Sequence, residues 1–203
     1  MIQFVQLHRE HVALISGAMT AVCVVPYLRD IARGTTKPQR ASWLVWASLS
    51  VVASVSQLIE GEMSGAWLAS GAAVGFTAVF IASIRRGEGG LARADVVAIV
   101  AASVGVALSL VVRQPMIALL AVVFAEFVAT ALTARKALLR PQTETLSTWM
   151  IDAVAGALAV AATTELSVAA LIYPLNHTGL NTWVALSIRR GRRRVAIGAA
   201  ASL

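Results

Sequence analysis

Ionisable and amide side chains interrupt three strongly apolar stretches in the second half of the chain. Glu126 sits in VVFAEFVAT, Asp152 in STWMIDAVAG, and Asn176 and His177 in LIYPLNHTGLNTW. A carboxylate in the middle of a membrane costs about 2.5–3.5 kcal/mol on insertion scales, so it faces a bundle interior or a wet cavity. Histidine titrates near neutral pH, so His177 with a carboxylate in reach could form a proton relay. The alternative is a hydrogen-bonded polar cluster that holds three helices together.

The composition around these residues predicts an all-α, polytopic membrane protein. The chain has 203 residues, of which 58% are hydrophobic and only 13% charged, with a mean hydropathy of +0.77. A soluble domain carries about 25% charged residues, and the single Cys23 excludes a disulfide scaffold. At about 20 residues per span, the chain has room for seven membrane helices and no soluble catalytic domain. The predicted spans are 11–33, 42–60, 64–84, 95–112, 115–135, 145–163 and 166–188.

Basic residues are distributed unevenly between the two sides of these spans. With the N-terminus outside, the loops after the first, third and fifth spans and the C-terminal tail hold 15 of the 17 Lys and Arg residues. Arg9 and Arg113 are the exceptions. The positive-inside rule therefore predicts an outside N-terminus and a cytoplasmic C-terminus. We interpret the tail IRRGRRRV as an anchor to anionic lipid headgroups and expect no nucleic-acid partner.

The chain also contains an internal repeat at an offset of 103 residues. Lys37-Pro38-Gln39 aligns with Arg140-Pro141-Gln142, Trp46 with Trp149, and Glu62 with Glu165. We interpret this as a duplicated three-helix unit. The unmatched fourth helix restores the chain direction, so that the two copies are parallel and related by an axis along the membrane normal. The predicted parts are a first repeat (1–90), a linker helix (91–114), a second repeat (115–191) and a basic cytoplasmic tail (192–203).

This 3+1+3 arrangement resembles the SWEET sugar transporters and the wider PQ-loop family. Pro26-Tyr27 stands at the position of the family's Pro-Gln motif, followed by Ser42-Trp43 at the start of the next helix. Tyr27 replaces the family's glutamine, and the second repeat has Ala129-Thr130 there instead of a proline. More narrowly, PYLRDIARGTTKPQRASWLVW and ARKALLRPQTETLSTW look like segments of a group of small bacterial membrane proteins.

The resemblance implies alternating access between the repeats, and with it roles for particular residues. Pro26 would be a hinge, and Tyr27, Asp30 and Arg33 would lie at an inner gate; a solvated cluster of Asp30 with Arg29 and Arg33 is the alternative. A helix-7 asparagine grips the sugar in SWEETs, and Asn176 is its match. The predicted solute-binding residues are Asn176, His177, Trp149 and Tyr173, and the predicted proton-coupling residues are Glu126 and Asp152.

Trp43, Trp46 and Trp149 are expected in an aromatic belt near the cytoplasmic face. Stacking on a planar ligand is the alternative interpretation.

The leading hypothesis is a transporter of a small polar solute, a sugar or an amino acid, in the inner membrane of a bacterium. The buried acids favour a proton-coupled or cationic solute. The competing hypothesis is a receptor or scaffold that keeps the fold without transport, because the family's hallmarks are partly lost. We expect no enzyme activity, cofactor or metal site, since no nucleophile–base pair or metal-ligand pattern is present. The expected partners are the lipid bilayer and the solute, and the sequence leaves a homo-oligomer open.

Overall fold

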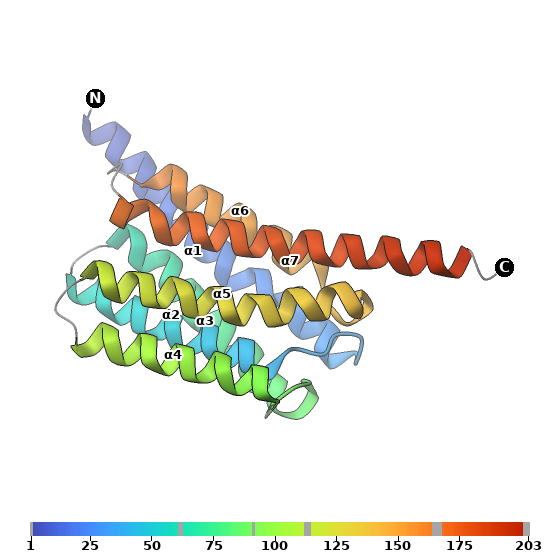
Figure 1. Ribbon diagram of the computed structural model, residues 1–203. Helices are drawn as coiled ribbons and strands as arrows, with labels where there is room; N and C mark the ends of the chain where they lie inside the picture. The colour runs from blue at the N-terminus through green and yellow to red at the C-terminus, as the bar shows by residue number, and fades with distance from the viewer. Residues whose placement is uncertain (1, 61–62, 91, 112–114, 164–167, 201–203) are drawn as a thin grey trace.

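The computed structural model describes residues 2–60, 63–90, 92–111, 115–163 and 168–200, and these form a bundle of helices (Figure 1). The elements in chain order are α1 (Ile2–Ala32), α2 (Arg40–Glu60), α3 (Met63–Arg86), α4 (Arg93–Val111), α5 (Pro115–Leu139), the 3-10 turn η1 (Pro141–Thr143), α6 (Leu146–Ala162) and α7 (Val168–Ala200). Each predicted span overlaps one helix over the described residues. The all-α fold class is therefore confirmed over the described residues.

Three helices are longer than the apolar runs that predict them. α1 begins at Ile2, α5 continues to Leu139, and α7 continues to Ala200 through the arginines of the predicted tail. Arginine and alanine are good helix formers, and no proline follows Pro174, so nothing in this segment ends the helix. In Figure 1, α7 projects beyond the other helices toward the C-terminus. The end of an apolar run is thus not the end of a helix.

Two described segments are long and apolar enough to cross a membrane by length and composition, namely His8–Ala32 and Ala66–Arg86. Arg40–Val55 and Leu146–Ala162 are apolar but shorter. This agrees with a helical membrane protein at a coarse level.

The third helix of each predicted repeat packs between the first two. α3 contacts both α1 and α2, and α7 contacts both α5 and α6. Between the halves, α1 packs on α6 and α2 on α5, while α4 contacts α5 and α2. Glu62 and Glu165, which the proposed repeat aligns, lie outside the described residues. The division into repeats remains a prediction, and the packing order is the same in both halves.

Glycines allow α1 and α3 to approach closely. A Cβ atom added to Gly71 would overlap the backbone of Gly17, and one added to Gly17 would overlap the carbonyl of Trp67. Small residues at a helix interface permit this backbone contact. Helices α1 and α3 are consequently held by direct backbone packing.

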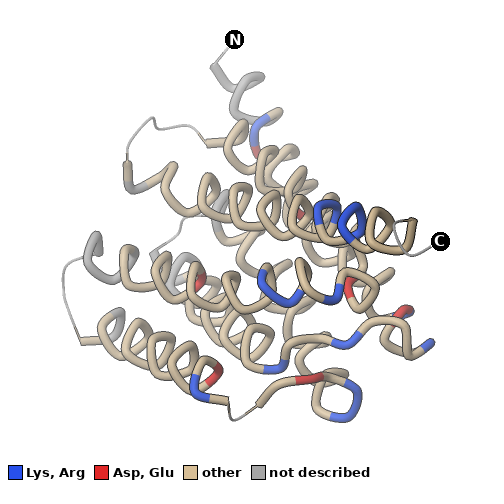
Figure 2. The backbone as a smooth tube through the Cα atoms, turned by 45° about the vertical axis from the view of Figure 1, so that its right-hand side comes forward, with Lys and Arg blue, Asp and Glu red and all other residues tan. Residues whose placement is uncertain are grey.

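The loops after α1, α3 and α5 lie at the same end of the bundle as the C-terminal part of α7, opposite the N-terminus (Figure 1). Lys and Arg residues gather at this end (Figure 2). We call it the basic end, formed by residues 33–40, 85–90, 92–93, 135–145 and 189–194. The charge asymmetry read from the sequence is thus an asymmetry of the folded bundle.

Candidate functional site

A small cavity lies in the bundle interior between the two halves. Five helices contribute to it. Where a helix supplies more than one lining residue, these include residues at the i, i+3 or i+4 spacing that places side chains on a common face. The lining residues are Trp43 and Trp46 of α2, Phe76 of α3, Glu126 and Thr130 of α5, Thr148, Trp149 and Asp152 of α6, and Leu180, Asn181 and His177 of α7. Acidic, hydroxyl and aromatic side chains therefore share one enclosed space.

Two polar pairs connect α7 to its neighbours beside this cavity; Glu126, Asp152 and His177 line it, whereas the predicted binding residue Asn176 is not among the lining residues. Asn176 Nδ2 donates a hydrogen bond of 2.7 Å to Glu126 Oε2 on α5. The next residue, His177, places Nε2 3.2 Å from Asp152 Oδ2 on α6. Successive residues of a helix point about 100° apart, so neighbours in α7 reach different helices. The structure thus brings together the four polar residues that interrupt the apolar stretches of the sequence.

These groups are deeply buried. Glu126, Asp152 and His177 have relative exposures of 5%, 2% and 5%. A buried carboxylate is costly unless it is paired or hydrogen-bonded. Each of the two carboxylates has one such partner on α7, which explains how the bundle tolerates them.

Several polar atoms of the cavity lining have no hydrogen-bond partner among the described residues. They are Oγ1 of Thr148, Oδ1 of Asp152, Nε1 of Trp43 and Nε2 of His177, all on side chains that are nearly or fully buried, and of these His177 Nε2 has the ion-pair contact with Asp152. Thr148 and Asp152 are four residues apart on α6 and so lie on the same face. Buried polar atoms in native proteins nearly always have a partner, so unpaired ones need an explanation such as water or a bound ligand.

Aromatic rings from both halves pack around the cavity. The ring centroid of Trp149 lies 5.8 Å from that of Trp43 and 5.6 Å from that of Trp46, and Phe76 stacks on His177 at 6.4 Å. The three tryptophans are only 1–6% exposed. The predicted aromatic belt at the lipid interface is therefore wrong for Trp43, Trp46 and Trp149. Their rings turn inward and pack against one another, because aromatic pairs gain from edge-to-face and tilted contacts beyond the burial of their surface.

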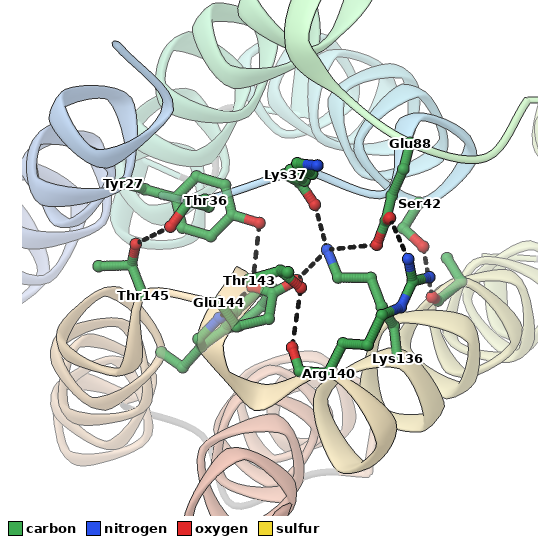
Figure 3. Close-up of polar contacts among 12 residues, drawn as sticks. Tyr27, Thr36, Lys37, Ser42, Glu88, Lys136, Arg140, Thr143, Glu144 and Thr145 are labelled. Carbon is green, nitrogen blue, oxygen red and sulfur yellow. Dashed lines mark hydrogen bonds and ion pairs between the residues drawn. The ribbon is translucent and has the colours of Figure 1, made fainter. Parts of the chain in front are cut away.

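A buried ion pair lies within the basic end (Figure 3). Lys136 Nζ of α5 lies 2.6 Å from Glu144 Oε1, and the two side chains are 4% and 0% exposed. The other oxygen, Oε2, accepts hydrogen bonds from the Tyr27 hydroxyl at 2.9 Å and the Trp149 indole at 3.1 Å. Trp149 also lines the cavity, so the ion pair is one side chain away from it.

The loops of the basic end are tied together around this ion pair. Lys136 also lies 3.5 Å from Glu88 Oε1 and donates to the backbone oxygen of Lys37. Arg140 Nη1 lies 2.6 Å from Glu88 Oε2. The loops after α1, α3 and α5 thus meet at one cluster, shown in Figure 3. We call Tyr27, Glu88, Lys136, Arg140 and Glu144 the end cluster.

A second set of contacts joins the α1–α2 loop to the start of α6. The hydroxyls of Thr36 and Thr145 are 2.7 Å apart, and Thr145 donates to Asp30 Oδ2 at 2.8 Å. Lys37 N donates to Thr143 O at 3.1 Å. The basic end is therefore closed by contacts from both halves of the chain.

The predicted gate and binding residues lie in different places. Tyr27 is fully buried in the end cluster, next to Pro26 inside α1. Asp30 contacts Thr145 and not the expected arginine cluster, while Arg33 is exposed. Tyr173 is half-buried, with its ring 6.3 Å from that of His177, and is not among the cavity-lining residues.

Sequence reasoning overlooked the Lys136–Glu144 pair and the cavity hydroxyls. Glu144 precedes the first residue of α6 by two positions, and a carboxylate at a helix start is easily interpreted as a solvated loop residue. The one available signal was that Glu144 lies four and five positions before Thr148 and Trp149 in ETLSTW.

No protein-family model, curated protein or solved structure matches the chain in the three comparisons.

Proposed function

We propose that this protein is a multi-pass membrane transporter that binds a small polar solute in the cavity between its two three-helix halves. The observation that carries the proposal is a pair of acceptors, Thr148 Oγ1 and Asp152 Oδ1, that have no hydrogen-bond partner within the described part of the chain and belong to residues lining a cavity between the halves. Binding sites are concave, largely apolar spaces with a few convergent polar groups. A solute would supply the missing partners.

The outer surface supports a membrane location. Large apolar side chains are exposed on all seven described helices, for example Val25, Val51, Val74, Val97, Phe124, Val154 and Leu175, each 45–69% exposed. Soluble monomers rarely expose extended apolar surface, whereas lipid tails would cover it. With the basic end on the cytoplasmic side, the proposed orientation follows the positive-inside rule.

The end cluster supports alternating access. It closes the basic end through contacts that join α1 of the first half to α5 and the start of α6 of the second. Release of a solute toward the cytoplasm would require Tyr27 and Lys136 to separate from Glu144. Pro26 precedes Tyr27 inside α1, and a proline removes a backbone hydrogen bond and loosens the preceding turn. We therefore assign the hinge of this movement to Pro26.

The experiment is a transport assay on the protein in liposomes, preceded by a thermal-shift screen of sugars, amino acids, nucleosides and amines. A ligand of the folded state raises the melting temperature by mass action. Thr148→Val should weaken the shift and the uptake of any hit. Thr182→Val is the matched control, because Thr182 is exposed and bonds only within α7. Equal effects of the two variants would contradict the proposal.

Glu126→Gln tests proton coupling. The amide keeps an oxygen that can accept from Asn176, so the α5–α7 contact survives while the titratable group is lost. We expect uptake to be abolished or uncoupled from a proton gradient in a folded protein. Unchanged uptake in this variant would remove proton coupling through Glu126.

A receptor or scaffold is the competing function, and α5 favours it. Pro115, at the first position of α5, is the only proline in this helix, which has Ala129-Thr130 where the resemblance places a hinge motif. Both halves need a flexible first helix for symmetric rocking. A protein that binds a solute but does not exchange it across liposome membranes would support this function.

A further inference from the structure

We infer, on the basis of the proposed function, that the solute is a small organic cation whose ammonium group lies between the carboxylates of Glu126 and Asp152 and the indole rings of the cavity. The inference rests on the charges that line the cavity, on where the nearby cations are bound, and on the faces of the aromatic rings.

The cavity lining is acidic. It contains Glu126 and Asp152 but no lysine or arginine among the described residues. His177 pairs with Asp152, so protonation of His177 would balance one carboxylate. Asn176 offers Glu126 only a neutral amide donor. When Glu126 is ionised, its charge therefore has no cationic side chain beside it in the described cavity lining other than His177, and a buried charge is costly without a partner.

The two basic side chains of the end cluster are already paired. Lys136 lies between Glu144 and Glu88, at 2.6 and 3.5 Å, and Arg140 pairs with Glu88 at 2.6 Å. The end cluster thus contains two cations and two carboxylates and is balanced by itself. Moving Lys136 toward Glu126 would leave Glu144 buried without its partner. When Glu126 carries no proton, its counter-charge would come from a bound molecule.

The aromatic rings suit a cation. Trp43, Trp46 and Trp149 all line the cavity, with centroids 5.2–5.8 Å apart. Indole rings attract cations through their negative faces, and aromatic cages recognise quaternary ammonium groups in this way. Asp152 Oδ1, for which the described residues supply no hydrogen-bond partner, adds an acceptor for an N–H or a counter-charge for a quaternary nitrogen. Neutral sugars also stack on tryptophan, so charge is the property to test.

The test compares cations with neutral molecules of the same shape. The full-length protein in detergent is titrated with choline and with 3,3-dimethylbutan-1-ol, in which carbon replaces the charged nitrogen. Lysine and norleucine form a second pair, and glucose is the uncharged polar probe. Binding is followed by the melting temperature and by tryptophan fluorescence. We expect at least one cation to bind at least ten-fold more tightly than its neutral counterpart.

Cavity variants locate the binding. Asp152→Asn and Glu126→Gln should each weaken binding of that cation at least ten-fold, and Thr182→Val should leave it unchanged. Size-exclusion chromatography shows whether each variant is folded. If the carboxylate variants do not fold, Trp46→Phe replaces them, because it keeps an aromatic ring with a weaker cation–π attraction, and it should lower the affinity for the cation but not for the neutral probe.

The outcomes separate this inference from the proposed function. Stronger binding of glucose or of the neutral isosteres would overturn the cationic solute and leave the cavity as a site. Binding that the cavity variants do not change would overturn the location. A cation that binds in the cavity but does not exchange in liposomes would support the inference and contradict transport. Absence of binding by all five probes would overturn the inference.

Discussion

Trp46 and Trp149 lie 103 positions apart in the sequence, and their ring centroids are 5.6 Å apart in the structure. The two residues occupy the same place in the repeat proposed from the sequence. Residues related by a two-fold axis contact each other where the axis passes between them. The proposed axis would exchange α1 with α5 and α2 with α6. It would therefore turn the contact of α1 with α6 into the contact of α5 with α2, and both contacts are present. The tryptophans therefore mark where the proposed axis would cross the interior.

Removal of Lys136 should destabilise the protein more than removal of the whole ion pair. In Lys136→Met, the fully buried Glu144 keeps its charge without its 2.6 Å partner, and breaking a buried pair costs about 3–5 kcal/mol. The double variant Lys136→Met/Glu144→Gln has no charge to leave unpaired, and the amide oxygen still accepts from Tyr27 and Trp149. Unfolding by sodium dodecyl sulfate in mixed micelles measures both. If the losses of unfolding free energy from the two substitutions simply add in the double variant, the pairing is contradicted.

Gly156→Ala should weaken the contact between α6 and α7. A Cβ atom at this position would lie 2.6 Å from Thr178 Oγ1 and 3.0 Å from His177 Cδ2. The overlap pushes His177 away from Asp152, at a cost of about 1–3 kcal/mol. Gly179→Ala is the matched control on α7, because a Cβ there meets nothing within 4 Å, and it should gain about 0.5–1 kcal/mol from helix propensity. A similar change in both variants would show that the contact is unimportant.

Tyr27→Phe should loosen the closed basic end. The variant removes the hydroxyl that donates to Glu144 Oε2 at 2.9 Å, and a hydrogen bond to a charged group contributes about 1.5–3 kcal/mol. The loss should shrink when Glu144 is already glutamine, since the neutral acceptor binds the hydroxyl less strongly. A double-mutant cycle on unfolding free energies measures this coupling. A coupling energy of zero would mean that the Tyr27 hydroxyl does not stabilise the protein through Glu144.

Cysteine labelling should report the orientation in the membrane. Cys23, the only cysteine of the chain, is 0% exposed, so it should not react in the folded protein. In a Cys23→Ala background, Glu10→Cys and Thr35→Cys place thiols at exposed positions near opposite ends of α1. A membrane-impermeant maleimide added to intact cells should label position 10 and not position 35. The reverse pattern would invert the proposed topology.

Much of the fold could be predicted because each helix is an apolar run bounded by charged loops. The rotation of each helix about its axis could not, since helices that are apolar on all sides give no amphipathic pattern to orient them. The convergence of Glu126, Asp152, Asn176 and His177 followed from the cost of exposing them to lipid. Which of these four residues pair with each other depends on the rotation of each helix about its axis.

The end cluster was beyond sequence reasoning for a different reason. Lys136 and Glu144 lie at the end of α5 and just before α6, where charged residues normally face water. Their burial depends on the α1–α2 and α3–α4 loops, which fold over them through Lys37 and Glu88. Contacts between loops far apart in the chain leave no local pattern in the sequence.

The chemical character of the end cluster determines how its opening would respond to temperature. The contacts of Glu144 with Lys136, Tyr27 and Trp149 are ionic or hydrogen-bonded. Separating them would hydrate mainly polar surface, which lowers the heat capacity, whereas exposed apolar surface raises it. Opening of this end should therefore lack the large positive heat-capacity change of unfolding. Its equilibrium constant should follow a nearly straight van't Hoff plot, so that a transport rate limited by this step would show little curvature between cold and warm conditions.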